Sequence, residues 1–244
     1  MRIKAVLLLL LTWSCQQAKK ETDRTNDAVE EKPVQLDTSI ALIDTLIKKS
    51  IAKTKIYNYD TLAWTDILDL DSSIILDLKY ATQDNFVKTK MYDCGRCFLR
   101  PKVAKAVLIA HQNLQRKGLG LKMFDCYRPR PIQWKLWGKL PDPRYVADPK
   151  KGSMHNRGGA VDLTIVDSSG NELDMGTPFD FFGREAYHAY MDLPEEVLKN
   201  RTLLKETMGQ VGFSPITTEW WHYSFRAEQY GLSDMLWECG DEGE

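Results

Sequence analysis

Residues 153–166 read SMHNRGGAVDLTIV, a polar turn followed by a run of mostly apolar and β-branched side chains. The run at 160–166 is short and rich in valine, isoleucine and threonine, which predicts a strand buried in a sheet. Gly158 and Gly159 precede it, and glycine allows the backbone conformations of a sharp turn. The polar side chains before the glycines are therefore expected to fold back towards the first residues of this strand.

Further strands and helices are predicted on both sides of this segment. Alternating or continuous apolar residues predict strands at 74–80, 119–124 and 220–225. Apolar residues at helical spacing, bounded by proline or glycine, predict helices at 101–117, 132–140 and 194–208. These elements do not follow a regular strand–helix–strand repeat. The predicted fold class is therefore α+β, a single domain with a mostly antiparallel central sheet flanked by helices.

The composition of the 244-residue chain excludes several classes of protein. Hydrophobic residues make up 43% and charged residues 27%, which excludes a collagen-like or wholly disordered chain. Thirty-three Lys and Arg stand against 34 Asp and Glu, a formal net charge of −1, and both signs are interspersed. Such a chain offers no basic surface for nucleic acid phosphates, so no nucleic acid partner is expected.

The N-terminus carries the pattern of an export signal. Arg2 and Lys4 precede an apolar run at 5–11, far shorter than the ~20 residues that span a bilayer. The run ends in Leu-Thr-Trp-Ser-Cys, which resembles the lipobox of bacterial lipoproteins. We expect residues 1–14 to be a signal peptide and Cys15 to carry a lipid, with a plain secretory signal as the alternative. The protein is then exported to the periplasm or cell envelope, and its lipid is the expected membrane contact.

A tether is expected between this N-terminus and the folded domain. Residues 15–35 are strongly polar: nine charged side chains and no aromatic residue follow Cys15, too little apolar surface to offset the entropy of ordering. Apolar residues at helical spacing within 40–51 then predict an amphipathic helix against the body of the domain. The domain is expected to span residues 36–244.

Four residues suggest a metal site. Two of the four histidines, His155 and His222, fall in the polar turn and in the predicted strand at 220–225. With Asp162 they offer two nitrogens and one oxygen, the ligand set of a catalytic zinc ion with one position left open. Glu219, three residues before His222, is suited to accept a proton from water beside the metal. Each residue also has an ordinary structural explanation, as a hydrogen-bonded histidine or a turn-capping carboxylate. The residues alone support a metallohydrolase hypothesis.

Several motifs resemble one peptidase family. The segments SMHNRGGAVD (153–162) and EWWHY (219–223) resemble the zinc D-alanyl-D-alanine dipeptidases of the vancomycin-resistance (VanX-like) type. Three further motifs resemble the same family in the same order: DLKYATQDNF (77–86), DCYRP (125–129), with cysteine where a small residue is usual, and MGTPFDF (175–181). The resemblance covers about 74–225 and implies the fold shared by the D-Ala-D-Ala metallopeptidases and the hedgehog signalling domain. It also implies hydrolysis of D-Ala-D-Ala to two D-alanines.

The resemblance implies catalytic roles for five residues. His155, Asp162 and His222 would hold one Zn²⁺ per chain, and Glu219 would act as general base and then as general acid. Arg128 would stabilise the developing oxyanion, because a planar guanidinium offers fixed, charged donors. A surface salt bridge is the alternative explanation of Arg128.

The resemblance also implies a binding site for a small dipeptide. An aspartate matching Asp180 meets the free amino group of the substrate, and a serine matching Ser153 positions the dipeptide. Tyr80 and Asn85 match further substrate-binding positions. Capping of a helix expected near Arg184 is the alternative role of Asp180.

Two other functions are compatible with the same residues. A D,D- or L,D-carboxypeptidase acting on peptidoglycan stem peptides would need only a more open cleft, because the zinc chemistry is shared. A non-catalytic, zinc-containing lipoprotein that binds the cell wall would need neither Glu219 nor Arg128. An exported dipeptidase would recover D-Ala-D-Ala released during wall turnover rather than confer glycopeptide resistance.

Besides Cys15, the chain has four cysteines: Cys94, Cys97, Cys126 and Cys239. In an exported protein four cysteines allow two disulfides, with three possible pairings. The spacing Cys-Gly-Arg-Cys at 94–97 also matches a redox pair or half of a zinc ribbon. A disulfide from Cys126, two residues before the arginine motif's Arg128, would brace that loop.

Overall fold

The computed structural model describes residues 57–239 of the chain. The signal peptide expected at 1–14, the tether at 15–35 and the helix expected at 40–51 lie outside the described residues. No helix among residues 57–239 combines the length and apolar character that crossing a membrane requires.

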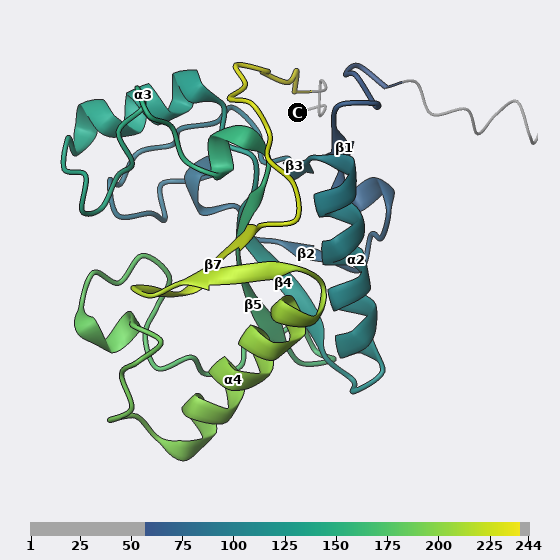
Figure 1. The fold of residues 1–244 in the computed structure, drawn as a ribbon, viewed down its shortest axis with the longest axis vertical. Helices are drawn as coiled ribbons and strands as arrows, with labels where there is room; N and C mark the ends of the chain where they lie inside the picture. The colour runs from purple at the N-terminus through teal and green to yellow at the C-terminus, as the bar shows by residue number, and fades with distance from the viewer. Residues whose placement is uncertain (1–56, 240–244) are drawn as a thin grey trace, which may run out of the picture. The chain divides into compact units, whose positions relative to one another are not determined.

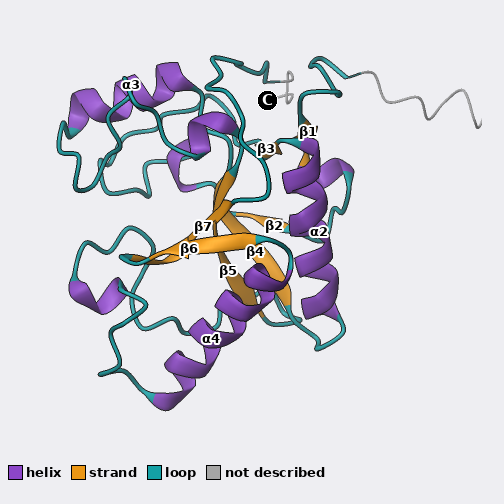
Figure 2. Ribbon diagram, in the orientation of Figure 1, coloured by secondary structure: helices purple, strands orange, loops and turns teal. Residues whose placement is uncertain are grey.

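A five-stranded sheet forms the centre of the described domain, and β5 is its middle strand (Figures 1 and 2). All neighbouring strands are antiparallel except β2 and β4, which are parallel. This confirms the α+β class and the predicted buried strand, since all seven residues of β5 are buried. In spatial order the strands are β2 (Ile75–Leu76), β4 (Gly120–Asp125), β5 (Ala160–Val166), β7 (Glu219–Phe225) and β6 (Phe213–Ile216).

Two long helices cover one face of the sheet. α2 (Pro101–Gln115) packs along β4, and α4 (Glu195–Gln210) packs along β5, β6 and β7 (Figure 1). The main core lies between these two helices and the sheet. Alternate residues of β5, Leu163 and Ile165, are fully buried there. Because side chains alternate across a strand, Asp162 points to the opposite face, away from these helices.

The opposite side of the domain is built from α3 (Arg130–Lys139) and long loops (Figure 2). A second apolar cluster joins Ile132 and Leu136 of α3 to Tyr80 and Val146 from the loops. A two-stranded antiparallel sheet, β1 (Thr65–Asp66) with β3 (Phe98–Leu99), lies apart from the main sheet. Four single 3₁₀ turns complete the described elements: η1 (Ile67–Asp69), η2 (Lys79–Ala81), η3 (His155–Arg157) and η4 (Arg184–Ala186).

The structure corrects two predicted elements. The strand expected at 74–80 is confined to β2, because β2 is an edge strand that pairs with β4 over two residues, after which the chain enters η2. The helix expected near Arg184 is only the 3₁₀ turn η4, which begins after Gly183 without a side-chain cap. Asp180 therefore caps no helix. β6 was not predicted, because Pro215 lies within it and glycine precedes it.

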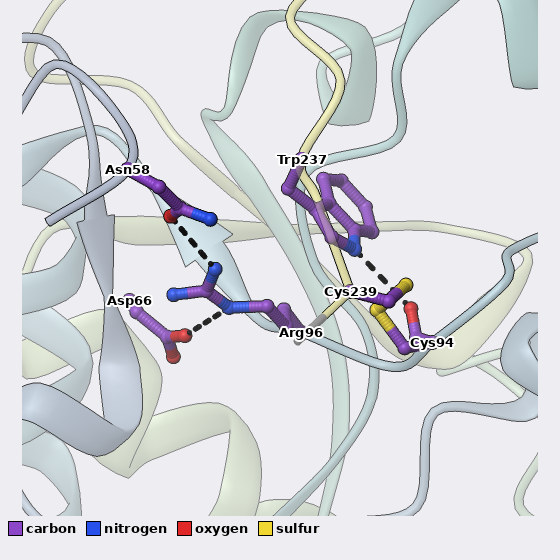
Figure 3. The surroundings of a disulfide bond; sticks show 6 residues. All are labelled: Asn58, Asp66, Cys94, Arg96, Trp237 and Cys239. Carbon is purple, nitrogen blue, oxygen red and sulfur yellow. Dashed lines mark hydrogen bonds and ion pairs between the residues drawn. A yellow bond between two sulfur atoms is a disulfide. The ribbon is translucent and has the colours of Figure 1, made fainter. Parts of the chain in front are cut away.

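Two disulfides join Cys94 to Cys239 and Cys97 to Cys126. The Cys-Gly-Arg-Cys pair is thus neither a redox pair nor half of a zinc ribbon, since each sulfur is bonded elsewhere. In Figure 3 the Cys94–Cys239 bond lies beside Trp237, whose indole N–H donates to the Cys94 carbonyl at 3.2 Å.

The chain after β7 forms what we call the C-terminal strap, residues 226–239, which has no helix or strand. Trp237 of the strap packs its ring against Tyr92 and Phe98. Earlier in the strap, Ser233 joins two other segments. Its N–H donates to the Asn156 carbonyl, and its carbonyl accepts from the Arg130 N–H. The strap therefore ties the η3 turn to the start of α3.

Candidate metal and catalytic site

Strand register brings two of the three predicted metal ligands together. Asp162 of β5 is paired with His222 of β7 on one side and with Asp125 of β4 on the other. Directly paired residues in an antiparallel sheet point to the same face. Asp125, Asp162 and His222 therefore form a row across the sheet, on the face opposite α2 and α4.

A tight turn brings the third ligand to this row. His155 lies in η3, and Gly158 follows with a left-handed φ of 68°. A Cβ on Gly158 would lie 2.4 Å from the Trp64 ring, so both conformation and space require glycine here. The turn returns the chain to β5 with His155 beside Asp162, as the sequence predicted.

The three ligand atoms form a compact triangle. His155 Nε2 lies 3.1 Å from His222 Nδ1 and 3.3 Å from Asp162 Oδ1, and His222 Nδ1 lies 2.9 Å from Asp162 Oδ1. Tetrahedral zinc with bonds of about 2.0–2.1 Å places its ligand atoms about 3.3 Å apart. The donor set and its spacing therefore fit a zinc ion held by two nitrogens and one oxygen.

Neighbouring groups orient these ligands. The Nδ1–H of His155 donates to the Cys126 carbonyl at 2.7 Å, which leaves the Nε2 lone pair facing Asp162. His222 Nε2 lies 3.0 Å from Ser224 Oγ, which leaves Nδ1 to face the same point. Burial opposes ionisation of Asp162, but the two histidines hold its pKa well below the usual range. The carboxylate is therefore ready to bind a cation.

Glu219 shares the cavity with the ligands because β7 is distorted. In a regular strand, residues three apart face opposite sides. Here Ile216 pairs with Glu219 and Pro215 pairs with Tyr223, so the ladder shifts between them. Glu219 and His222 consequently line the same cavity. Burial, followed by the charge of Asp162, raises the pKa of Glu219 to about 7.

Arg128 is buried and firmly held. Its Nε and Nη2 donate to Asp125 Oδ2, and its Nη1 donates to Gln133 Oε1 at 3.1 Å. The guanidinium also lies over the Tyr80 ring, 4.7 Å from its centroid. With 8% of the residue exposed, this is no surface salt bridge, and Arg128 lines the cavity. Three of its five N–H groups donate to Asp125 and Gln133, which fixes the orientation of the guanidinium.

Asp180 and Tyr80 form a pair on the far side of the cavity. The Tyr80 hydroxyl donates to Asp180 Oδ2 at 3.0 Å, and both residues line the cavity. Asp180 has a left-handed φ of 58°. Burial, followed by the charge of Asp162, raises its pKa well above the usual range. Within residues 57–239 it forms no ion pair.

The remaining two predicted site residues are placed differently. Ser153 lines the cavity, and its hydroxyl donates to Asn156 Oδ1 at 3.2 Å. Asn85 does not line it. Its amide instead donates to the carbonyls of the loop that contains it and lines a neighbouring hollow that also borders Asp180.

The cavity has a volume of about 340 Å³ and is polar on most sides. The sequence reasoning did not assign roles to Asp125 and Gln133, which hold Arg128, or to Tyr145, which lines the cavity. Asp125 begins the arginine motif and so had a sequence signal, whereas Gln133 and Tyr145 lie outside all the quoted motifs.

A family profile and several curated proteins match this chain. A family profile described as D-ala-D-ala dipeptidase matches residues 61–237. A D-alanyl-D-alanine dipeptidase of Escherichia coli (strain K12) is 36% identical over 181 residues, which cover 74% of this chain and 94% of the relative. A D-alanyl-D-alanine dipeptidase of Enterococcus faecium is 31% identical over 175 residues, covering 63% and 87%.

Among solved structures, the vancomycin resistance D,D-pentapeptidase VanY with Zn(II) has a TM-score of 0.36 and 17% identity, and the match covers 53% of this chain and 73% of that one. This likeness is too low to carry its properties over. The family profile and the curated relatives confirm the resemblance drawn from the sequence motifs. The chain therefore belongs to the D-ala-D-ala dipeptidase family and is a peptidase.

Proposed function

We propose that this protein hydrolyses the dipeptide D-Ala-D-Ala to two D-alanines, using one zinc ion held by His155, Asp162 and His222. The observation that carries the proposal is the convergence of those three ligand atoms with Glu219 and Arg128 on one small cavity. The names of the curated relatives support the choice of substrate.

The residues around the cavity divide the chemistry among them. Bound zinc would polarise the peptide carbonyl and lower the pKa of water. Glu219 takes a proton from the attacking water and gives it to the leaving amino group as the C–N bond breaks. Glu219 lines the same cavity as the three ligand atoms, which gives it access to that water. Arg128, whose guanidinium lines the same cavity, would stabilise the oxyanion that develops.

The two ends of a dipeptide also match this cavity. A free ammonium would supply the cation that half-buried Asp180 lacks among residues 57–239, and binding it would favour the ionised carboxylate. Ser153, at another part of the wall, offers a hydroxyl to the peptide. Because Asp180 needs a cation, a dipeptide with a free amino group fits better than an acylated one.

The direct test is D-alanine release by the full chain loaded with zinc. The substrates are D-Ala-D-Ala, D-Ala-D-Ala-D-Ala and a stem pentapeptide ending in D-Ala-D-Ala, and Glu219→Ala is the control. Turnover of the dipeptide that the control loses is the expected result. Cleavage mainly of the pentapeptide would instead establish a carboxypeptidase, and bound zinc with no turnover would establish a wall-binding domain.

We also propose that the protein is exported and lipidated at Cys15. The basic residues and apolar run before Cys15 support export. Two disulfides among the described residues also fit an oxidising compartment. Wild type should fractionate with membranes and carry the mass of a lipid, whereas Cys15→Ala should lose both. A soluble wild type with an unmodified N-terminal peptide would contradict the proposal.

A further inference from the structure

The segment 179–182 contributes Asp180 to the wall of the cavity. Phe179 points inward, with its ring 5.0 Å from that of Phe124 and 5.5 Å from that of Trp221. Asp180 follows with its left-handed φ, which turns the chain so that its carboxylate reaches Tyr80. Such a conformation persists in a non-glycine residue where surrounding contacts hold it. The segment is therefore anchored on its inner side by Phe179.

The same segment is anchored on its outer side by two rings. Phe182 packs against Phe86 with centroids 5.1 Å apart and against Tyr145 with centroids 4.5 Å apart. We call Phe86, Phe182 and Tyr145 the aromatic bridge. Phe182 is 44% exposed and Tyr145 is 39% exposed, so the bridge lies at the surface rather than in the core.

The bridge joins two walls of the cavity that are distant in sequence. Tyr145 lies in the loop after α3, whose residues 143–145 line the cavity beside Arg128 and His155. Phe182 comes from the wall that carries Asp180. Rings 4.5 Å apart are in van der Waals contact, which leaves no passage for a peptide chain between them.

A second hollow of about 340 Å³ meets the cavity at Asp180. It is lined by Phe86 of the bridge, by Lys79 and Lys88, and by Asp180, which borders both hollows. A peptide extended beyond the amino group that meets Asp180 would need space between the wall that carries Asp180 and Tyr145, and Phe182 contacts Tyr145 there. The extension would also turn the ammonium into an amide and leave Asp180 without a cation.

We propose that the aromatic bridge sets substrate length, with Phe182 and Tyr145 excluding peptides that extend beyond the amino group at Asp180. The inference rests on the proposed function, because it assumes that the substrate's amino end lies at Asp180. Phe182 is a specificity-determining residue in this scheme, because its ring holds the contact with Tyr145 of the cavity wall.

Equilibrium binding to the zinc-loaded full chain tests this inference without relying on turnover. In a Glu219→Gln background, titration calorimetry measures affinity for D-Ala-D-Ala and for a stem pentapeptide ending in D-Ala-D-Ala. Phe182→Ala and Tyr145→Ala should each raise pentapeptide affinity about tenfold and change dipeptide affinity little. Phe181→Ala is the matched control, because Phe181 is 37% exposed and adjacent in sequence but outside the bridge. Phe182→Leu serves as the second variant, and thermal melting verifies folding.

The outcomes separate this inference from the proposed function. If the background protein prefers the dipeptide and the bridge variants keep that preference, the bridge has no such role while the proposed function stands. If the dipeptide fails to bind but the bridge variants gain pentapeptide affinity, the proposed function fails and the bridge is supported. Equal gains in Phe181→Ala and Phe182→Ala would also overturn the role of the bridge.

Discussion

Two of the three candidate metal ligands lie on strands, whereas the side of the cavity that would hold the substrate's amino end is built on loops. Asp162 and His222 are paired in register on β5 and β7. Asp180 and Tyr145 lie in segments without helix or strand, and side-chain contacts hold them. Strand pairing fixes ligand positions through many backbone hydrogen bonds at once, while each loop residue depends on a few contacts. Substrate preference can therefore change without disturbing the metal site.

The largest loss of zinc and of activity is expected from replacing Asp162, the middle residue of the row formed by Asp125, Asp162 and His222. Asp162→Ala removes the ligand atom that lies within 3.3 Å of both histidine nitrogens. Zinc content after dialysis should fall towards zero, and kcat/KM should fall by about a thousandfold or more. Thr164→Val, two residues along the same strand, is the control and should keep its zinc. Full zinc occupancy in Asp162→Ala would show that the ligand set is wrong.

The next largest effect is expected at Arg128, which sits on a loop but is bound to the strand residue Asp125. Arg128→Lys keeps the charge but loses the paired donors, so kcat should fall about a hundredfold, with a smaller change in KM and no loss of zinc. Steady-state kinetics and metal analysis measure the three quantities. Arg130→Lys alters an exposed pair with Asp234 and should leave kcat unchanged. A rise in KM alone would contradict transition-state stabilisation by Arg128.

The loop residue Asp180 is expected to affect how the stability of the protein depends on pH. The pKa of Asp180 is raised in the folded protein. At pH values between the unfolded-state and folded-state pKa, the folded protein therefore binds more protons than the unfolded chain. The free energy of unfolding consequently falls as pH rises through this range. Asp180→Asn should flatten that fall in the metal-free protein and raise its melting temperature near neutral pH. The same variant should raise KM for D-Ala-D-Ala about tenfold or more, because the ammonium loses its partner. Identical pH–stability curves for variant and wild type would contradict this account.

The smallest effect on activity is expected from removing the Cys97–Cys126 disulfide. Cys97→Ser with Cys126→Ser frees the loop whose Cys126 carbonyl accepts from His155. Stability to urea should fall by about 3 kcal/mol, and kcat should fall only a few-fold. Unchanged kcat and unchanged stability would mean that the bond does not brace the arginine loop.

Sequence patterns predicted the parts of the molecule that local chemistry determines. The apolar run of β5, the proline and glycine that bound α2, and the histidine and aspartate around Gly158 all carried local signals, and the structure brings His155, Asp162 and His222 together as expected. Other features depend on pairing between distant segments. The short β2, the shifted ladder at Glu219 and the contact of Phe182 with Tyr145 arise only once the sheet and loops have assembled. Disulfide pairing belongs to this second group, since three pairings were equally compatible with the sequence.

The Cys94–Cys239 bond closes a covalent ring that spans 145 positions of the chain. Arg128, His155, Asp162, Glu219 and His222 all lie inside that ring. A protease that cuts any single peptide bond between the two cysteines therefore opens the ring but leaves one covalent molecule. A nicked chain would run as two fragments on a reducing gel and as one band without reductant. If the protein is exported as proposed, one cut by a protease would still leave Glu219 and the three candidate metal ligands in one covalent molecule.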